Sequence, residues 1–210
     1  MEHAAPDEFV SGLARAELAL DELRESTGTI VLVEGDSDAA AVTTLAGRFH
    51  TSRIRDRLVV SAHGVTNYRR LLTRIRAAHP QRRVVGLYDE PEERIVRRAL
   101  ERSGFGTPLS RDGIERLGFF ACVEDLEDEL IRSIGVDGVE RLVDSQGELA
   151  AFRILQQHPA QRGRPIDQQL RRFMGTRSAR KIRYGHLLAA EVDLDRCPAP
   201  LRRIVLDLEP

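Results

Sequence analysis

The stretch that decides the fold is Ile30-Val31-Leu32-Val33 followed by Glu34-Gly35-Asp36-Ser37-Asp38. Its first four residues are apolar and mostly β-branched, which is typical of a buried strand, so a strand is expected over residues 29–33. Glu34-Gly35 ends the strand with a tight turn. Residues 39–47 then have the apolar spacing of a helix, which Asp36 or Ser37 is expected to cap.

The same order of strand, turn and helix recurs three more times along the chain. Strands that alternate with helices of about ten residues favour a parallel sheet with right-handed crossovers. The fold class is therefore expected to be α/β, with a parallel sheet of about four strands and flanking helices. The further strands are predicted over residues 57–62, 83–88 and 118–123, and the further helices over residues 67–78, 91–103 and 125–134.

Purely helical patterns lie on both sides of this unit. One helix is predicted over residues 8–25, and after Gly135 the apolar spacing is helical throughout, over residues 136–143, 147–157, 166–174 and 180–192. We therefore expect three parts, which are an N-terminal docking helix (residues 1–28), an α/β domain (29–135) and a helical, arginine-rich extension packed on it (136–210).

Acidic residues follow three of the four predicted strands. Glu34 follows the first strand, Asp89 the third, and residues 124–129 the fourth. Because the carboxyl ends of parallel strands meet at one edge of a sheet, we expect these acids to converge there, with Asp38 facing the same crevice. Carboxylates held together repel one another unless a cation lies among them, and such oxygen-rich sites suit Mg²⁺ or Mn²⁺. Each acid alone could equally cap a helix.

Composition sets outer limits on the function. An apolar content of 41% in 210 residues is ordinary for a soluble globular protein, and the apolar runs are too short to span a bilayer. The first ten residues are acidic rather than signal-like, so a cytoplasmic protein with no membrane partner is expected. Cys122 and Cys197 are too few for a zinc site or a disulfide framework.

Positive charge is concentrated in residues 151–186, where Asp167 is the only acidic residue. Such a stretch can face the phosphates of a nucleic acid, although a solvated helical surface would have the same composition. The arginines predicted to bind nucleic acid are Arg171, Arg172, Arg177, Arg180 and Arg183.

Three of these segments resemble the motifs of a known family. Residues 30–38 resemble the first Toprim motif, in which a strand delivers an active-site glutamate followed by glycine. Residues 84–92, VVGLYDEPE, resemble the second, and residues 119–130, FFACVEDLEDEL, resemble the third acidic segment of Toprim domains in OLD-family nucleases. Residues 180–184, RKIRY, are similar to a segment of actinobacterial Toprim-only proteins regarded as ATP-dependent endonucleases. The resemblance spans residues 29–201.

The resemblance implies a Toprim fold and a metal-dependent active site. It implies Glu34, Asp38 and Asp89 as catalytic metal ligands, with Asp125 or Glu127 as a further ligand.

The second motif departs from the family's usual Asp-x-Asp, because Pro91 stands where the second aspartate would be. Glu92, with its longer side chain, could take the place of that ligand, or one of two metals is lost.

Lys181 is the only lysine among 32 lysine and arginine residues. Lysine delivers a compact charge on a slim stem, which suits a phosphate oxygen or a developing negative charge better than the broad arginine fork does. OLD-type Toprim nucleases, by resemblance, also use a lysine from their C-terminal part. We therefore expect Lys181 to be catalytic and to reach toward Glu34, Asp38 and Asp89, although chance retention of one lysine is the alternative.

These features favour an OLD-like Toprim endonuclease that uses Mg²⁺ or Mn²⁺ and acts on nucleic acid, on DNA rather than RNA. The sequence has no Gly-Lys-Ser or Gly-Lys-Thr phosphate loop, so any ATPase is expected to be a partner in trans. The alternatives are a catalytically weak or inactive Toprim module that binds nucleic acid or a partner, and a nucleotidyl transferase. A homodimer is compatible with all three.

Overall fold

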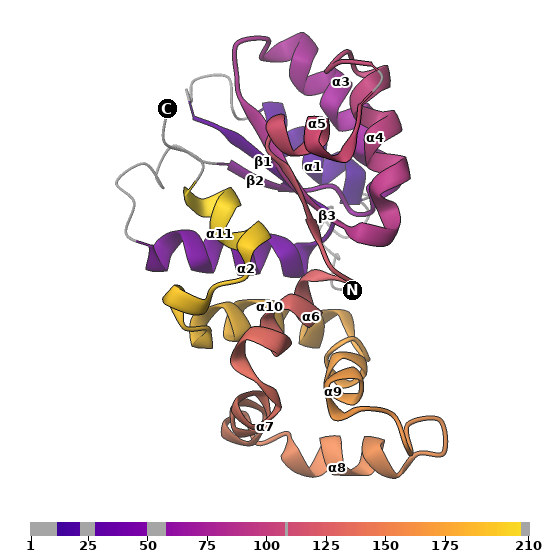
Figure 1. The fold of residues 1–210 in the computed structure, drawn as a ribbon, viewed down its shortest axis with the longest axis vertical. Coiled ribbons are helices and arrows are strands. Elements are labelled where there is room, and N and C mark those ends of the chain that lie inside the picture. Colours follow the sequence, from indigo (N-terminus) through magenta and orange to yellow (C-terminus); the bar gives the residue numbers. More distant parts are fainter. Residues whose placement is uncertain (1–11, 22–27, 50–57, 108, 207–210) are drawn as a thin grey trace, which may run out of the picture.

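The computed structural model describes residues 12–21, 28–49, 58–107 and 109–206. A parallel sheet of four strands lies in the upper half of the view in Figure 1. The strands are β1 (Ile30–Val33), β2 (Leu58–Ser61), β3 (Val84–Asp89) and β4 (Phe119–Cys122), in the spatial order β2-β1-β3-β4. Every neighbouring pair is parallel, and Ile30 is in register with both Leu58 and Val84. The predicted α/β fold class is confirmed.

Both faces of the sheet are buried, as expected for a parallel sheet covered by its crossover helices. Along β1, Val31 and Val33 enter one core, whereas Ile30 and Leu32 enter the other. This alternation follows from the two-residue period of a strand.

Each face is covered by its own set of helices. The core that contains Ile30 and Leu32 is covered by α1 (Gly12–Asp21), α3 (Tyr68–Ala78), α4 (Glu93–Arg102) and α5 (Arg111–Arg116). The core that contains Val31 and Val33 is covered by α2 (Asp36–Arg48), α6 (Leu126–Ile134), α10 (Ser178–Glu191) and α11 (Ala199–Leu206).

Three further helices lie at the end of the molecule away from the sheet (Figure 1), namely α7 (Val136–Ser145), α8 (Leu149–Gln157) and α9 (Ile166–Met174). Phe152, Phe173 and Tyr184 join them to α10 through edge-on ring contacts with centroids 5.4 and 6.4 Å apart. The longest described helix, α10, has 14 residues, and no described helix is long and apolar enough to cross a membrane.

Helix α10 returns to the sheet domain and packs directly on α2. Gly185 makes this approach close, because a Cβ atom there would lie 2.5 Å from the carbonyl oxygen of Ser37. The C-terminal extension is therefore in contact with the helix that carries Asp38.

Some helix boundaries differ from the predicted ones. Helix α2 begins at Asp36 with Gly35 as its N-cap, so the prediction that Asp36 or Ser37 caps it was wrong; the Asp38 carboxylate instead accepts from the Gly35 amide. The helix predicted over residues 91–103 begins as a 3-10 turn, η5 (Glu90–Glu92), before α4. Helices α5 and α11 were not predicted, and both ends of the helix predicted over residues 8–25 lie outside the described residues.

Candidate metal centre

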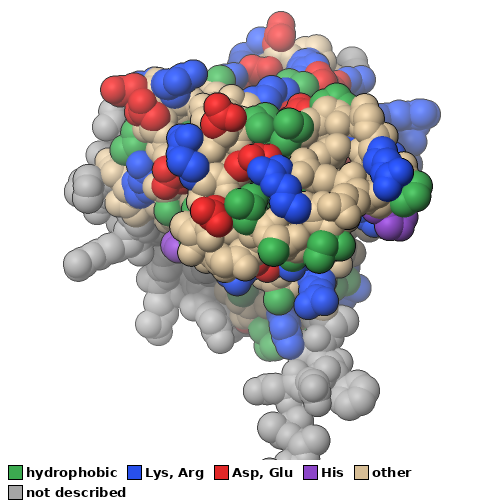
Figure 2. All heavy atoms as spheres, turned by 90° about the horizontal axis from the view of Figure 1, so that it is seen from below, with side chains coloured by type: hydrophobic (Ala, Val, Ile, Leu, Met, Phe, Trp, Pro, Cys, Tyr) green, Lys and Arg blue, Asp and Glu red, His purple; other side chains and the backbone are tan. Residues whose placement is uncertain are grey.

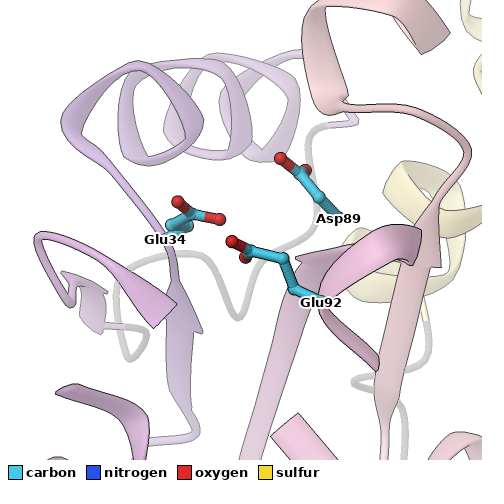
Figure 3. A group of neighbouring side chains, drawn as sticks. All are labelled: Glu34, Asp89 and Glu92. Atoms are coloured by element: carbon cyan, nitrogen blue, oxygen red, sulfur yellow. The ribbon is translucent and has the colours of Figure 1, made fainter. Parts of the chain in front are cut away.

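The carboxyl ends of β1 and β3 bring three acidic side chains together (Figure 3). Each of Glu34, Asp89 and Glu92 offers an oxygen atom, and these atoms lie within 4.8 Å of one another. Glu34 follows β1 and Asp89 ends β3, so the parallel pairing of these neighbouring strands places both at one edge. The η5 turn directs the Glu92 carboxylate back toward Glu34.

Burial and proximity make Glu34 and Asp89 reluctant to ionise. Burial raises the pKa of Glu34 to about 7, and its contact with Glu92 adds to the shift. Burial also raises the pKa of Asp89 to about 8, with a further contribution from the charge of Glu34. Negative charge is therefore unfavourable at this edge of the sheet, and a bound cation would relieve it.

The same side chains have unused ligand atoms. One carboxylate oxygen of Glu34 and one of Glu92 are buried without any hydrogen-bond partner. A buried carboxylate without a partner is costly, whereas a hard divalent cation binds such oxygens preferentially. The donor set of Glu34, Asp89 and Glu92 therefore fits a hard divalent cation such as Mg²⁺ or Mn²⁺.

Asp38 and Glu127 line a cavity of about 160 Å³ together with Glu34, Asp89 and Lys181. Asp38 accepts a hydrogen bond of 2.8 Å from the Gly35 amide, and burial together with the Glu127 charge raises its pKa to about 7. The pKa of Glu127, on α6, is also raised, chiefly by burial.

Lys181 reaches this cavity from the first turn of α10. Its Nζ atom lies 3.4 Å from Oε1 of Glu127. Burial lowers the pKa of the ammonium, but Glu127 and Asp38 outweigh this effect and raise the pKa above its usual value. Lys181 is therefore charged and lies beside the carboxylates, where the sequence led us to expect it.

The structure distinguishes the two candidates in the third acidic segment. Asp125 caps α6, with one oxygen accepting from the Asp128 amide at 2.8 Å and the other from Nε of Arg171 at 2.6 Å. Both oxygens are thus engaged, and Asp125 is not among the residues that line the cavity. Glu127 lines it, and its Oε1 atom has no hydrogen bond but lies 3.4 Å from Nζ of Lys181.

Two turns at the carboxyl ends of the strands have strained backbone, and the sequence revealed the strain of neither. Among the described non-glycine residues, only His63 and Glu124 have positive φ, at 50° and 63°. They follow β2 and β4, and such backbone costs on the order of 1–3 kcal/mol and clusters at functional sites. The amide of Asn67 holds the first turn by donating to the carbonyls of Ala62 and His63 at 2.9 and 3.1 Å. Asn67, four residues after His63, is the feature of the sequence that could have indicated this strained turn.

The predicted nucleic-acid arginines divide into two groups. Arg180 donates to Glu148 at 2.9 Å and lies over the Phe173 ring at 4.3 Å, and Arg183 pairs with the same carboxylate. Arg171, as described, binds Asp125. The other two, Arg172 and Arg177, form no ion pair with any described residue.

Figure 2 shows the end of the molecule that is formed by the helical extension, where acidic and basic side chains are interspersed. A cavity of about 540 Å³ beside α9 has the same mixed character, because its arginines alternate with Glu124, Asp128 and Asp167. Much of the positive charge in residues 151–186 is therefore neutralised locally.

Known structures share this fold. The C-terminal region of the Xanthomonas campestris pv. campestris OLD protein, in a structure phased with platinum, is 23% identical with a TM-score of 0.64, over 89% of this chain and 94% of that one. The C-terminal region of the Burkholderia pseudomallei OLD protein is 21% identical with a TM-score of 0.59, over 86% and 96%. No family model and no curated protein matches the sequence. The expected likeness to the Toprim part of OLD proteins is confirmed for the fold.

Proposed function

We propose that this chain is a phosphodiester hydrolase that depends on Mg²⁺ or Mn²⁺ and cuts nucleic acid, as an OLD-like Toprim endonuclease. The observation that carries the proposal is the cluster of Glu34, Asp89 and Glu92, whose oxygens lie within 4.8 Å of one another and include two buried atoms without partners. These 210 residues contain no Gly-Lys-Ser or Gly-Lys-Thr phosphate loop, so any ATPase activity coupled to cleavage would come from outside them.

Glu34, Asp89 and Glu92 would hold the cation. Glu127 and Asp38, which line the cavity with Glu34 and Asp89, would be available to a second ion or to ordered water. When bound, the ion would orient the attacking water and stabilise the negative charge that develops on the phosphoryl oxygens.

The protein's own groups have complementary roles. Asp38, whose pKa of about 7 matches neutral pH, can accept a proton on its Oδ1 atom while the Gly35 amide holds Oδ2. The Lys181 ammonium can contact a phosphate oxygen, since Glu127 anchors it at the cavity without burying it completely.

An inactive binding module is the alternative, and Pro91 favours it because it removes an acid from the second motif. The position of Glu92 favours activity, because its carboxylate offers a third oxygen within 4.8 Å of those of Glu34 and Asp89.

The test is incubation of purified protein with plasmid, single-stranded DNA and RNA in Mg²⁺, Mn²⁺ or EDTA. We expect cleavage with a divalent ion, none in EDTA, and at least a roughly 100-fold loss in Glu34→Gln, because a direct ligand is removed. The matched control is Asp144→Asn, which removes an exposed carboxylate on α7. Cleavage that persists in Glu34→Gln would reject the proposal.

A further inference from the structure

A second groove lies on the other face of the sheet, between η4 (Val65–Asn67), the start of α3, and α4. It has a volume of about 220 Å³. Three exposed arginines form its rim, Arg69 on α3 and Arg98 and Arg102 on α4.

These arginines differ from their neighbours in having no acidic partner. On the same two helices Arg70 pairs with Glu17, Arg74 with Asp21 and Arg97 with Glu93. No described carboxylate lies within ion-pair distance of Arg69, Arg98 or Arg102. The positive charge at the rim is therefore free to bind an external anion, and the arginine fork matches phosphate geometry.

The groove begins beside the metal centre. Val65, at its near end, is two residues after His63, which lines the metal cavity. On α4, Ile95 in the groove is three residues after Glu92 of the acidic cluster. From Ile95 to Arg102 the helix rises by roughly 10 Å at 1.5 Å per residue, which is long enough for two successive phosphates of one strand.

The floor of the groove is apolar. Val65 and Ala99 are buried there, and Ile95 is 43% exposed although it is a large hydrophobic residue. An apolar floor beneath cationic groups suits the sugars and phosphates of a nucleic-acid strand better than it suits a small inorganic anion. The cavity beside α9 is less suited, because three carboxylates share its lining.

We propose that this α3–α4 groove, defined by Val65, Arg69, Ile95, Arg98 and Arg102, binds the sugar-phosphate backbone of the strand whose phosphodiester bond lies at the metal centre. The proposal rests on the proposed function and names the path that the substrate takes. It moves the main phosphate-binding surface from the α9–α10 arginines to the opposite face of the sheet.

The test compares two triple variants in the Glu34→Gln background, which prevents cleavage. Arg69→Gln/Arg98→Gln/Arg102→Gln removes the groove's charges. Arg116→Gln/Arg141→Gln/Arg202→Gln removes the same number of exposed charges elsewhere. Binding of a labelled oligonucleotide, single-stranded and duplex, is measured by fluorescence anisotropy at several salt concentrations, after thermal unfolding has shown that both variants fold.

We expect the groove variant to bind at least roughly 10-fold more weakly at physiological salt. Its log–log salt slope should be shallower by roughly 2, because each lost phosphate contact removes about 0.7 to 0.9. The control variant should keep the salt slope of the Glu34→Gln protein that carries no further substitution. A further variant, Arg172→Gln/Arg177→Gln, removes the two arginines of the α9–α10 surface that form no ion pair with a described residue. The inference would be overturned by equal salt slopes in the groove and control variants, or by a slope that changes only in Arg172→Gln/Arg177→Gln.

Failure of the groove is distinguishable from failure of the proposed function. If the unsubstituted protein does not cleave in Mg²⁺ or Mn²⁺, the proposed activity is rejected. The salt slopes then still show whether the groove binds nucleic acid. If the unsubstituted protein cleaves, and the groove variant with Glu34 intact cleaves with the same kcat/KM, the proposed role of the groove is rejected. The proposed activity is then retained.

Discussion

Nζ of Lys181 lies 3.4 Å from Oε1 of Glu127, whose side chain is only 3% exposed. The two residues come from α10 and α6, and the contact brings a charge from the C-terminal extension to the acidic edge of the sheet. Because Glu127 keeps a buried oxygen without a hydrogen bond, the ammonium is its main compensation. The extension is thus part of the candidate site rather than an appendage to it.

This pairing predicts a coupling between the two side chains. Lys181→Met should lower the free energy of unfolding by about 1–3 kcal/mol, because it leaves a buried acid uncompensated. In Glu127→Gln protein the same change should cost much less. Urea denaturation of the four proteins in this double-mutant cycle measures the difference, and additive effects would contradict the pairing.

Lys181→Arg tests the proposed catalytic role of the Lys181 ammonium. The charge is retained, but the broad guanidinium does not reproduce a compact ammonium between Glu127 and Asp38. We expect kcat to fall by at least roughly 10-fold while binding of the uncut oligonucleotide stays within about 2-fold, a loss confined to the transition state. Normal kcat in the arginine variant would show that the lysine has no special role.

Gly185 predicts how sensitive the centre is to the position of α10. A Cβ atom there would lie 2.5 Å from the Ser37 carbonyl oxygen, so Gly185→Ala must push α10 away from α2. We expect a loss of about 1–3 kcal/mol in stability and a reduced kcat, since Lys181 is one helical turn away. The control is Gly47→Ala on α2, where nothing lies within 4 Å and a gain of up to about 1 kcal/mol is expected. Thermal unfolding and cleavage rates of the two variants check this, and equal behaviour would contradict it.

The raised pKa values predict how stability depends on pH without metal. In the unfolded chain these carboxyls ionise near their ordinary values of 3.8 to 4.5, whereas folded Glu34 and Asp38 titrate at about 7 and Asp89 at about 8. Between these limits the folded state binds more protons, so their contribution to the free energy of unfolding is full below pH 4 and is lost as pH rises to about 8. Urea denaturation in EDTA should show this fall.

Asp89→Asn provides the comparison for the pH experiment, because it removes the group with the highest of these pKa values. Its stability should fall less steeply than that of the parent between pH 5 and 8. Added Mg²⁺ should raise the parent's stability more at pH 8 than at pH 6, since the ion competes with protons for the same oxygens. Identical pH profiles for parent and variant would contradict the assignment.

The sheet and its acidic edge could be predicted because they depend on local patterns. Each strand was located to within about a residue, and the meeting of Glu34 and Asp89 follows from parallel strands alone. The return of the Glu92 carboxylate to Glu34 depends on the η5 turn at Pro91, which a helical reading of that segment did not include.

Contacts between distant segments could not be predicted in the same way. Arg171 pairs with Asp125, which is 46 residues away in the sequence, and Arg180 pairs with Glu148, which is 32 residues away. The positive charge of residues 151–186 is therefore partly neutralised by acidic residues from other segments. Conversely, the groove arginines Arg98 and Arg102 lie in a segment that also contains acidic residues, and only the fold shows that these acids pair elsewhere. Arg69 lies in residues 57–88, which contain no acidic residue. The distribution of charged residues along the sequence therefore did not predict the ion-pair partners of several of these arginines.

The most direct test of the central claim is a calorimetric titration of the protein with Mn²⁺ at pH 7.5, repeated for Glu34→Gln, Glu92→Gln and Glu90→Gln. Glu90 is two residues from Glu92, but its carboxylate accepts from Arg111 at 2.6 Å outside the cluster, which makes it a matched control. We predict saturable binding in the parent and in Glu90→Gln, with affinity at least roughly 10-fold lower in Glu34→Gln and in Glu92→Gln. Unchanged Mn²⁺ affinity in Glu34→Gln and Glu92→Gln would contradict the claim that these carboxylates form a metal centre.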